Sequence, residues 1–123
     1  MAKRHSTDLR NRTRAHRAAA RARRATLIAA HRVRTGARSL TTHVLAVGLP
    51  SEDAKSMVDT LRKHAKKNAI KGRRARSRRT SDGFLRKATT VYRYTREQVA
   101  AIVATYKPRK PAFKAARAAL AAA

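Results

Sequence analysis

Basic side chains dominate the residues of this sequence that could do chemistry. The chain of 123 residues holds 32 Lys and Arg against six Asp and Glu, which gives a formal net charge of +26. Five arginines recur at alternating spacings of four and three residues: Arg10, Arg14, Arg17, Arg21 and Arg24. That spacing aligns them in one stripe along a helix, roughly 21 Å long at about 1.5 Å per residue. We expect these guanidinium groups to contact a run of nucleic-acid phosphates.

A second basic cluster lies in residues 71–79, where six of nine side chains are Lys or Arg. Its arginines are also expected to contact phosphates: Arg73, Arg74, Arg76, Arg78 and Arg79. Ser81-Asp82-Gly83 is a turn signal, and the segment TVYRY that follows has the composition of a strand. These signals predict a β-hairpin over residues 76–94 with a basic tip or flank. The alternative is an unstructured basic loop around a shorter hairpin.

No grouping of side chains in the sequence points to catalysis, a metal site or a cofactor. The five histidines are never spaced four apart, and no acid stands beside them at a metal-site spacing. The absence of cysteine excludes disulfides, thiolate zinc sites and iron–sulfur clusters. There is no glycine-rich phosphate loop and no nucleophile elbow. We therefore expect a protein that is not an enzyme, with His43 and His64 in structural roles.

Bulky apolar side chains are concentrated in residues 40–106, which hold 18 of them, whereas the other 56 residues hold seven. This distribution predicts a folded domain over residues 40–106. Residues 1–39 form a basic Arg/Ala-rich helical arm, and residues 107–123 form a basic C-terminal helical extension. The two ends are expected to be binding arms that lie outside the core.

The arm is predicted to be one long helix because Ala and Arg favour helix and neither Pro nor Gly interrupts residues 8–35. Ser6 or Thr7 would cap its start, Asp8 would lie in the first turn, and Gly36 would end it. A smooth face of small side chains runs beside the arginine stripe: Ala15, Ala18, Ala22, Ala25, Ala29 and Val33. Repulsion between the arginines predicts that a partner orders this helix. A disordered basic tail is the alternative.

A short helix over residues 39–48, a glycine turn at Gly48 and a longer helix from Ser51 to about Asn68 are predicted next. This outline resembles a helix-turn-helix. With the basic hairpin added, residues 40–94 resemble a winged helix at the level of the fold. The resemblance implies that one helix enters the major groove of DNA while the wing follows the backbone. The base-edge candidates on the outer face of the second helix are Lys55, Ser56, Thr60 and Lys63.

The C-terminal part offers a competing helix-turn-helix. Thr95 and Gln98 form a capping box that opens a helix through Tyr106, and a last helix is expected over residues 112–122 with Lys114 and Arg117 exposed. The connector at residues 107–111 could enter a minor groove or only separate the helices. The stretch YTREQVAAI…YKPRK resembles small basic proteins of actinobacterial phages and plasmids, a likeness that implies no mechanism.

The expected fold is mainly α with a small β-hairpin, built as a winged-helix-like centre between a long basic N-terminal helix and a C-terminal helix. The expected function is non-enzymatic binding of double-stranded DNA, as a small transcription regulator or a phage or mobile-element factor. RNA or ribosome association is the second choice, and histone-like or phage packaging of nucleic acid is the third. Outward-facing Tyr92 and Tyr94 would favour RNA or single strands, but we expect both in the core. No membrane partner is expected, and a bacterial cytoplasmic, nucleoid- or phage-associated location follows.

Overall fold

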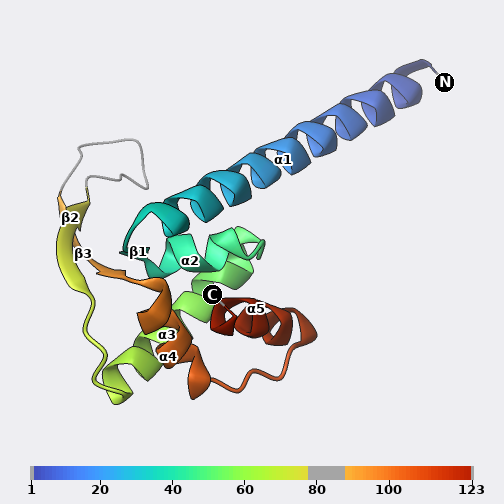
Figure 1. Cartoon of the computed structure of the whole chain (residues 1–123). Coiled ribbons are helices and arrows are strands. Elements are labelled where there is room, and N and C mark those ends of the chain that lie inside the picture. The colour runs from blue at the N-terminus through green and yellow to red at the C-terminus, as the bar shows by residue number, and fades with distance from the viewer. Residues whose placement is uncertain (1, 78–87, 123) are drawn as a thin grey trace.

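The computed structural model describes residues 2–77 and 88–122, which form five helices and a small three-stranded antiparallel sheet (Figure 1). The elements follow in the order α1 (Ala2–Thr35), β1 (Arg38–Ser39), α2 (Leu40–Ala46), α3 (Ser51–Lys67), β2 (Arg73–Ser77), β3 (Thr89–Tyr94), α4 (Arg96–Ala104) and α5 (Pro111–Ala121). The predicted class, mainly α with a small hairpin, is confirmed. None of the helices in the described ranges is long and apolar enough to cross a membrane.

The core is built from α2, α3, α4 and α5, with Tyr94 added from the end of β3. Its most deeply buried side chains include Met57 and Leu61 of α3 and Ile102 of α4. Ala116 and Leu120 of α5 are buried in the same cluster. The expectation that the C-terminal stretch lies outside the core is therefore wrong for α5, because two turns of that helix supply apolar contacts that the centre needs.

Helix α1 packs on the domain only through its last turns, where Ala29 and Val33 are buried, and its contacts are mainly with α2. Figure 1 shows the rest of α1 projecting away from the domain. Residues 5–25 are exposed apart from a half-buried Ala20, so roughly 31 Å of helix stands free at about 1.5 Å per residue. The helix begins at Ala2. The predicted cap at Ser6 or Thr7 is therefore wrong, and Asp8 lies beyond the first turn.

The predicted helix pair is present as α2 and α3, joined by a turn at Gly48 with a left-handed φ of 89°. Neither helix of the pair is capped by a serine side chain. Pro50, rather than Ser51, is the N-cap of α3, and Ser39 is the N-cap residue of α2 but makes no side-chain bond to the helix backbone. The Ser39 hydroxyl instead lies 3.1 Å from that of Thr42. The pair is held by apolar contacts rather than by polar caps.

The sheet has the strand order β1-β3-β2, so a two-residue strand from before the helix pair adds to the later hairpin. Strand β2 begins at Arg73, three residues earlier than predicted, and Ala75 pairs with Val91. The predicted turn at Ser81-Asp82-Gly83 lies outside the described residues. Gly72 lies close to the end of β3: a Cβ there would come within 2.9 Å of the Arg93 carbonyl and the Tyr94 ring. Only glycine leaves room for this buried ring.

The predicted capping box at the start of α4 is confirmed. The Gln98 backbone amide donates to Thr95 Oγ1 at 3.2 Å, and Thr95 N–H donates to Gln98 Oε1 at 2.9 Å. Gln98 Nε2 also donates to the Lys71 carbonyl, which ties α4 to the segment that leads into β2. Helix α5 begins at Pro111, one residue earlier than predicted, a position in the first turn that proline favours.

Candidate nucleic-acid interface

The four base-edge candidates lie on α3, away from its buried stripe, but they do not form one row. Lys55, Ser56 and Lys63 are exposed, whereas Thr60 is half-buried and donates its hydroxyl to the Ser56 carbonyl at 3.2 Å. Lys55 and Thr60 are about 140° apart around the helix axis. Ser56 and Lys63 lie between them, opposite the core. A groove that receives this helix would therefore meet Ser56 and Lys63 first, and the other two at its flanks.

The outward face of α3 also carries acids, which are not among the base-edge candidates predicted from the sequence. Asp59 is exposed and forms an ion pair with Arg62 at 3.7 Å. Glu52 and Asp53 stand in the first turn, where they complement the helix dipole. A carboxylate repels phosphate but can accept a hydrogen bond from the amino group of cytosine. Asp59 is therefore a further base-edge candidate. Its position in the sequence, between Ser56 and Lys63 on the same helix, could have indicated this role.

The phosphate candidates of the hairpin that lie within the described residues, Arg73, Arg74 and Arg76, are all exposed. Arg78 and Arg79 lie outside the described residues. Arg73 pairs directly with Arg93 of β3, and Arg74 pairs with Tyr92. Like charges directly opposite on two strands destabilise their pairing. The hairpin therefore gathers positive charge at a cost that a polyanion would relieve.

The arginine stripe of α1 lies on the free part of the helix. Arg10, Arg14, Arg17, Arg21 and Arg24 are all exposed. The smooth face divides: Ala29 and Val33 are buried on the domain, whereas Ala15, Ala18, Ala22 and Ala25 on the projecting part are exposed. The arm thus presents its guanidinium groups to solvent over its whole free length.

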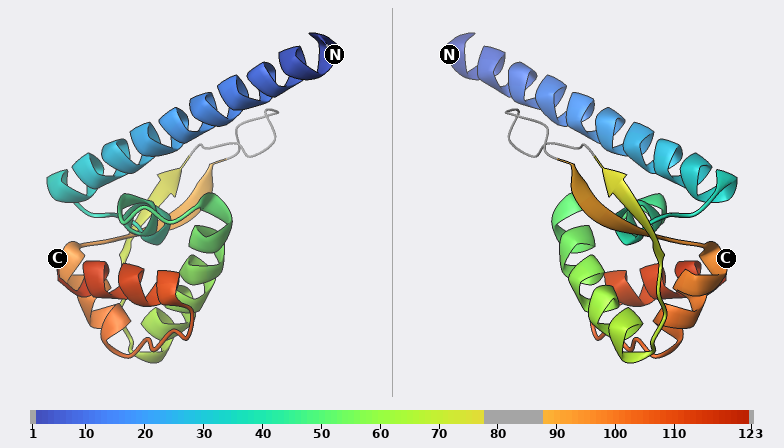
Figure 2. Two further views of the ribbon diagram at one scale, coloured as in Figure 1. Left: turned by 90° about the vertical axis from the view of Figure 1, so that its right-hand side faces the viewer. Right: turned by 90° about the vertical axis from the view of Figure 1, so that its left-hand side faces the viewer.

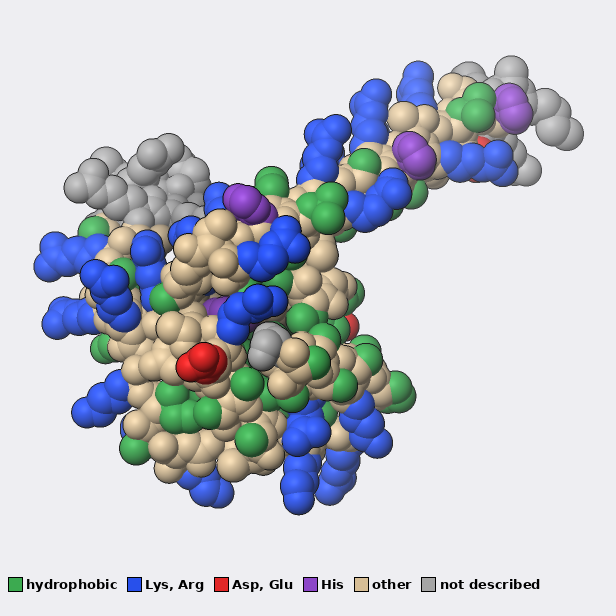
Figure 3. Space-filling view, in the orientation of Figure 1, with side chains coloured by type: hydrophobic (Ala, Val, Ile, Leu, Met, Phe, Trp, Pro, Cys, Tyr) green, Lys and Arg blue, Asp and Glu red, His purple; other side chains and the backbone are tan. Residues whose placement is uncertain are grey.

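The arm, the hairpin and α3 lie toward one side of the molecule. In both side views of Figure 2 the free part of α1 and the β2–β3 pair extend toward the side where α3 lies, and the C-terminus lies at the other side. Figure 1, taken at right angles, shows α1 and the hairpin diverging from the domain. In the same orientation, Figure 3 shows Lys and Arg side chains around the margin and along α1. The three basic elements therefore form a fork with α3 near its base.

The structure bears on two predicted alternatives, the C-terminal helix-turn-helix and the outward-facing tyrosines. Arg117 does not lie free for a second helix-turn-helix, because its guanidinium donates to the carbonyls of Val103 and Ala104 at 3.1 and 3.4 Å at the end of α4. Lys114 remains exposed. The tyrosines separate: Tyr94 is in the core, as expected, whereas Tyr92 is 53% exposed, which corrects the expectation that both are buried.

The two central histidines have structural contacts. His43 is buried, and its Nε2 lies 2.8 Å from the Tyr94 carbonyl, which can only accept a hydrogen bond. Burial lowers the pKa of His43 below 6.5, so its ring is neutral at pH 7. His64 Nδ1 lies 3.2 Å from Thr105 Oγ1, and its ring meets Tyr106 edge-on. The described residues bring together no group of three or more His, Cys, Asp or Glu that could hold a metal ion.

No protein family, no curated protein and no solved structure matches this chain.

Proposed function

We propose that this chain is a non-enzymatic protein that binds double-stranded DNA and acts as a small transcription regulator or as a DNA-binding factor of a phage or mobile element. The observation that carries the proposal is the fork of three basic elements on one side of the domain. A helix pair followed by an antiparallel basic hairpin has the winged-helix outline, and it supplies a helix for a groove and a wing for the backbone.

The balance of charge supports a polyanionic partner. Within residues 2–77 and 88–122 the one ion pair joins Asp59 to Arg62, at the surface. The stripe arginines of α1 and the arginines of β2 are therefore exposed to solvent without an ion-pair partner in these ranges. Repulsion at a net charge of +26 destabilises the compact state, and binding to phosphates removes that cost while releasing counterions from the DNA.

The roles of the basic residues divide between affinity and sequence preference. Phosphate contacts from α1 and the hairpin supply affinity that depends on salt and ignores sequence. Ser56 and Lys63, flanked by Lys55 and Thr60, supply the polar groups that can reach base edges. The acid at Asp59 adds an acceptor to the same face.

Two sets of substitutions test this division. Replacing Arg73, Arg74, Arg76, Arg78 and Arg79 with Ala should weaken binding to all duplex sequences alike and flatten the dependence of log K on log salt. The double variant S56A/K63A loses a single charge, so it should reduce the slope of log K against log salt by no more than about one unit. It should, however, change which duplex sequences are preferred. Binding-site selection from a random duplex pool measures the preference. If the five arginine substitutions change the preferred sequence instead, the assigned roles are wrong.

A second candidate, binding of RNA or single strands, rests on one observation. Tyr92 is exposed and stands directly across from Arg74, so its ring offers a stacking surface beside a cation. Stacking would contribute about 1–3 kcal/mol per base. Tyr92→Leu should then weaken binding of a single-stranded oligonucleotide at least about fivefold and leave duplex affinity unchanged. An equal, small effect on both would remove the reason to prefer RNA.

A further inference from the structure

A pocket opens between the last turns of α1 and the helices α2, α4 and α5. Its volume is about 140 Å³, and its walls are mostly aliphatic, from Val33, Val47, Val99 and Leu120. The walls come from two pairs of helices, α1 with α2 and α4 with α5, and the two pairs are distant from each other in sequence, so the pocket exists only in the assembled fold. An engineered apolar cavity of about 150 Å³ accepts benzene, so this space is large enough for a six-membered ring.

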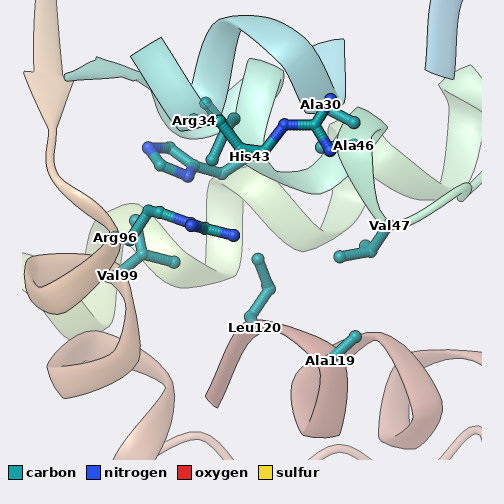
Figure 4. Close-up of a pocket in the computed structure, with 10 residues that line it drawn as sticks. Ala30, Arg34, His43, Ala46, Val47, Arg96, Val99, Ala119 and Leu120 are labelled. Atoms are coloured by element: carbon teal, nitrogen blue, oxygen red, sulfur yellow. The ribbon is translucent and has the colours of Figure 1, made fainter. Parts of the chain in front are cut away.

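Two arginines stand over this apolar space. Both arginines line the pocket, and Figure 4 shows Arg96 of α4 pointing toward Leu120 and Arg34 of α1 lying beside Ala30 and Ala46. Neither guanidinium is paired with an acid within the described ranges, where the one ion pair is Asp59 with Arg62. The charge of Arg96 also reaches His43, whose pKa it helps to lower. Two cations thus line one pocket, and neither is in an ion pair within the described ranges.

The remaining polar group of the lining cannot supply that counter-charge. His43 is buried, and its Nε2–H donates to the Tyr94 carbonyl. A neutral imidazole carries no negative charge, and the other lining residues besides Arg34 and Arg96 are Ala, Val and Leu. The pocket therefore combines an apolar floor with a positive rim, and no acidic side chain lines it.

We propose that this pocket binds a small organic anion, a carboxylate on an apolar body about the size of a benzene ring. The planar guanidinium groups of Arg34 and Arg96 would hold the carboxylate, a geometry in which two parallel N–H···O bonds form. The aliphatic walls would take the ring. Free phosphate lacks the apolar body that this floor would cover, and it is the competing occupant that the test distinguishes.

The position of the pocket gives such a ligand a consequence for the arm. Arg34 and Val33 belong to the only part of α1 that packs on the domain, whereas Arg96, Val99 and Leu120 belong to α4 and α5. A bound anion would join these elements and favour one orientation of the projecting helix. This inference goes beyond DNA binding and does not depend on it, because the binding measurement below uses no DNA.

The test is a titration of the full-length protein with sodium benzoate at about 0.15 M chloride, followed by methyl and amide NMR signals. We expect saturable shifts centred on Val33, Val47, Val99 and Leu120. Benzamide, which has the same shape and no charge, should bind at least about tenfold more weakly, since it cannot form charge-assisted bonds to two arginines.

Three variants localise the site. R34Q/R96Q should weaken benzoate binding at least about tenfold. R32Q, which removes an exposed charge from the same helix outside the pocket, should leave it unchanged. A119F fills the space from its rim without altering charge, so it should abolish binding while the core methyl signals stay in place.

Three results would overturn the proposal. The first is equal affinity for benzoate and benzamide. The second is loss of binding in R32Q as large as in R34Q/R96Q. The third is displacement of benzoate by inorganic phosphate at equal concentration, because the two arginines would then bind phosphate without any contribution from the apolar walls.

Discussion

At the scale of single residues, the polar groups of the core show how a strongly basic chain keeps a small interior neutral. His43 lies inside the domain, donates to the Tyr94 carbonyl, and has its pKa lowered by burial. Arg117 reaches back to the carbonyls that end α4 and complements the dipole of that helix. Every buried side-chain nitrogen and oxygen in the part of the chain that the structure describes has a hydrogen-bond partner.

The lowered pKa of His43 makes stability depend on pH. Since the folded pKa lies below the unfolded value of 6.5, the unfolded chain binds more protons as the pH falls through that value. We expect the free energy of unfolding to decrease between pH 7.5 and pH 5.5, with a steeper slope in the native protein than in H43Q, which keeps a donor but does not titrate. Urea unfolding followed by circular dichroism at the two pH values measures it. Equal slopes would mean that folding does not lower the pKa of His43.

Ala69, which follows the C-cap of α3, has a left-handed φ of 55°. A side chain at such a position costs about 1–2 kcal/mol, which glycine avoids at some entropic cost. A69G should therefore raise the free energy of unfolding by roughly 0.5–1 kcal/mol. Ala118→Gly, on an exposed site inside α5, should lower it by about 1 kcal/mol. Denaturant midpoints of the two variants should move in opposite directions, and a fall in both would refute this conformation at Ala69.

At the scale of elements, the parts that the sequence predicts are those fixed by neighbours in the chain. The Thr95–Gln98 box and the turn at Gly48 follow from the few residues around them. Strand β1, only two residues long, exists because β3 pairs with it. The separation of Tyr92 from Tyr94 also depends on distant packing, since strand alternation alone places both on one face.

The sequence predicted the basic residues of the candidate interface but not their grouping. Periodicity placed Lys55, Ser56, Thr60 and Lys63 outside the core, yet Thr60 turns its hydroxyl to the Ser56 carbonyl. The contribution of α5 to the core could not be seen locally, because six of its 11 residues are Ala and only Leu120 is bulky besides Phe113. The fork itself depends on the direction in which α1 leaves the domain, which no local pattern encodes.

A substitution at Gly72 tests how closely the start of the hairpin packs against the end of β3. A methyl group there would meet the Arg93 carbonyl and the Tyr94 ring at 2.9 Å, so G72A should destabilise the fold by about 1–3 kcal/mol. Gly36 has open space around it and no left-handed φ, which makes G36A a matched control with a change of at most about 1 kcal/mol, in the stabilising direction. Thermal or denaturant unfolding measures both. A neutral G72A would show that Tyr94 moves aside freely.

Substitutions in the arm test whether α1 contacts DNA as an oriented helix. R14Q/R21Q removes two charges from the stripe, and R12Q/R23Q removes two from a position about 150° around the same helix. The stripe pair should lower the slope of log K against log salt by about 1.8, and the control pair by clearly less. Equal losses in fluorescence anisotropy titrations across salt would instead describe an unoriented basic tail.

At the scale of the whole molecule, we propose that α3 reads a groove of the duplex while the two basic extensions, α1 and the hairpin, contact its backbone. The extensions provide charge, and the domain provides orientation. A packager or an RNA-organised protein would share the charge but not the preference, so affinity alone does not separate these functions.

The most direct test measures affinity and preference together. Labelled duplex DNA and labelled structured RNA are titrated with the protein across a range of salt, each with unlabelled mixed competitor, and binding is followed by fluorescence anisotropy. We expect the protein to prefer the duplex and to remain bound to a subset of DNA sequences when the competitor is present near physiological salt. Equal binding of all DNA and RNA that disappears along one steep salt dependence would contradict this proposal.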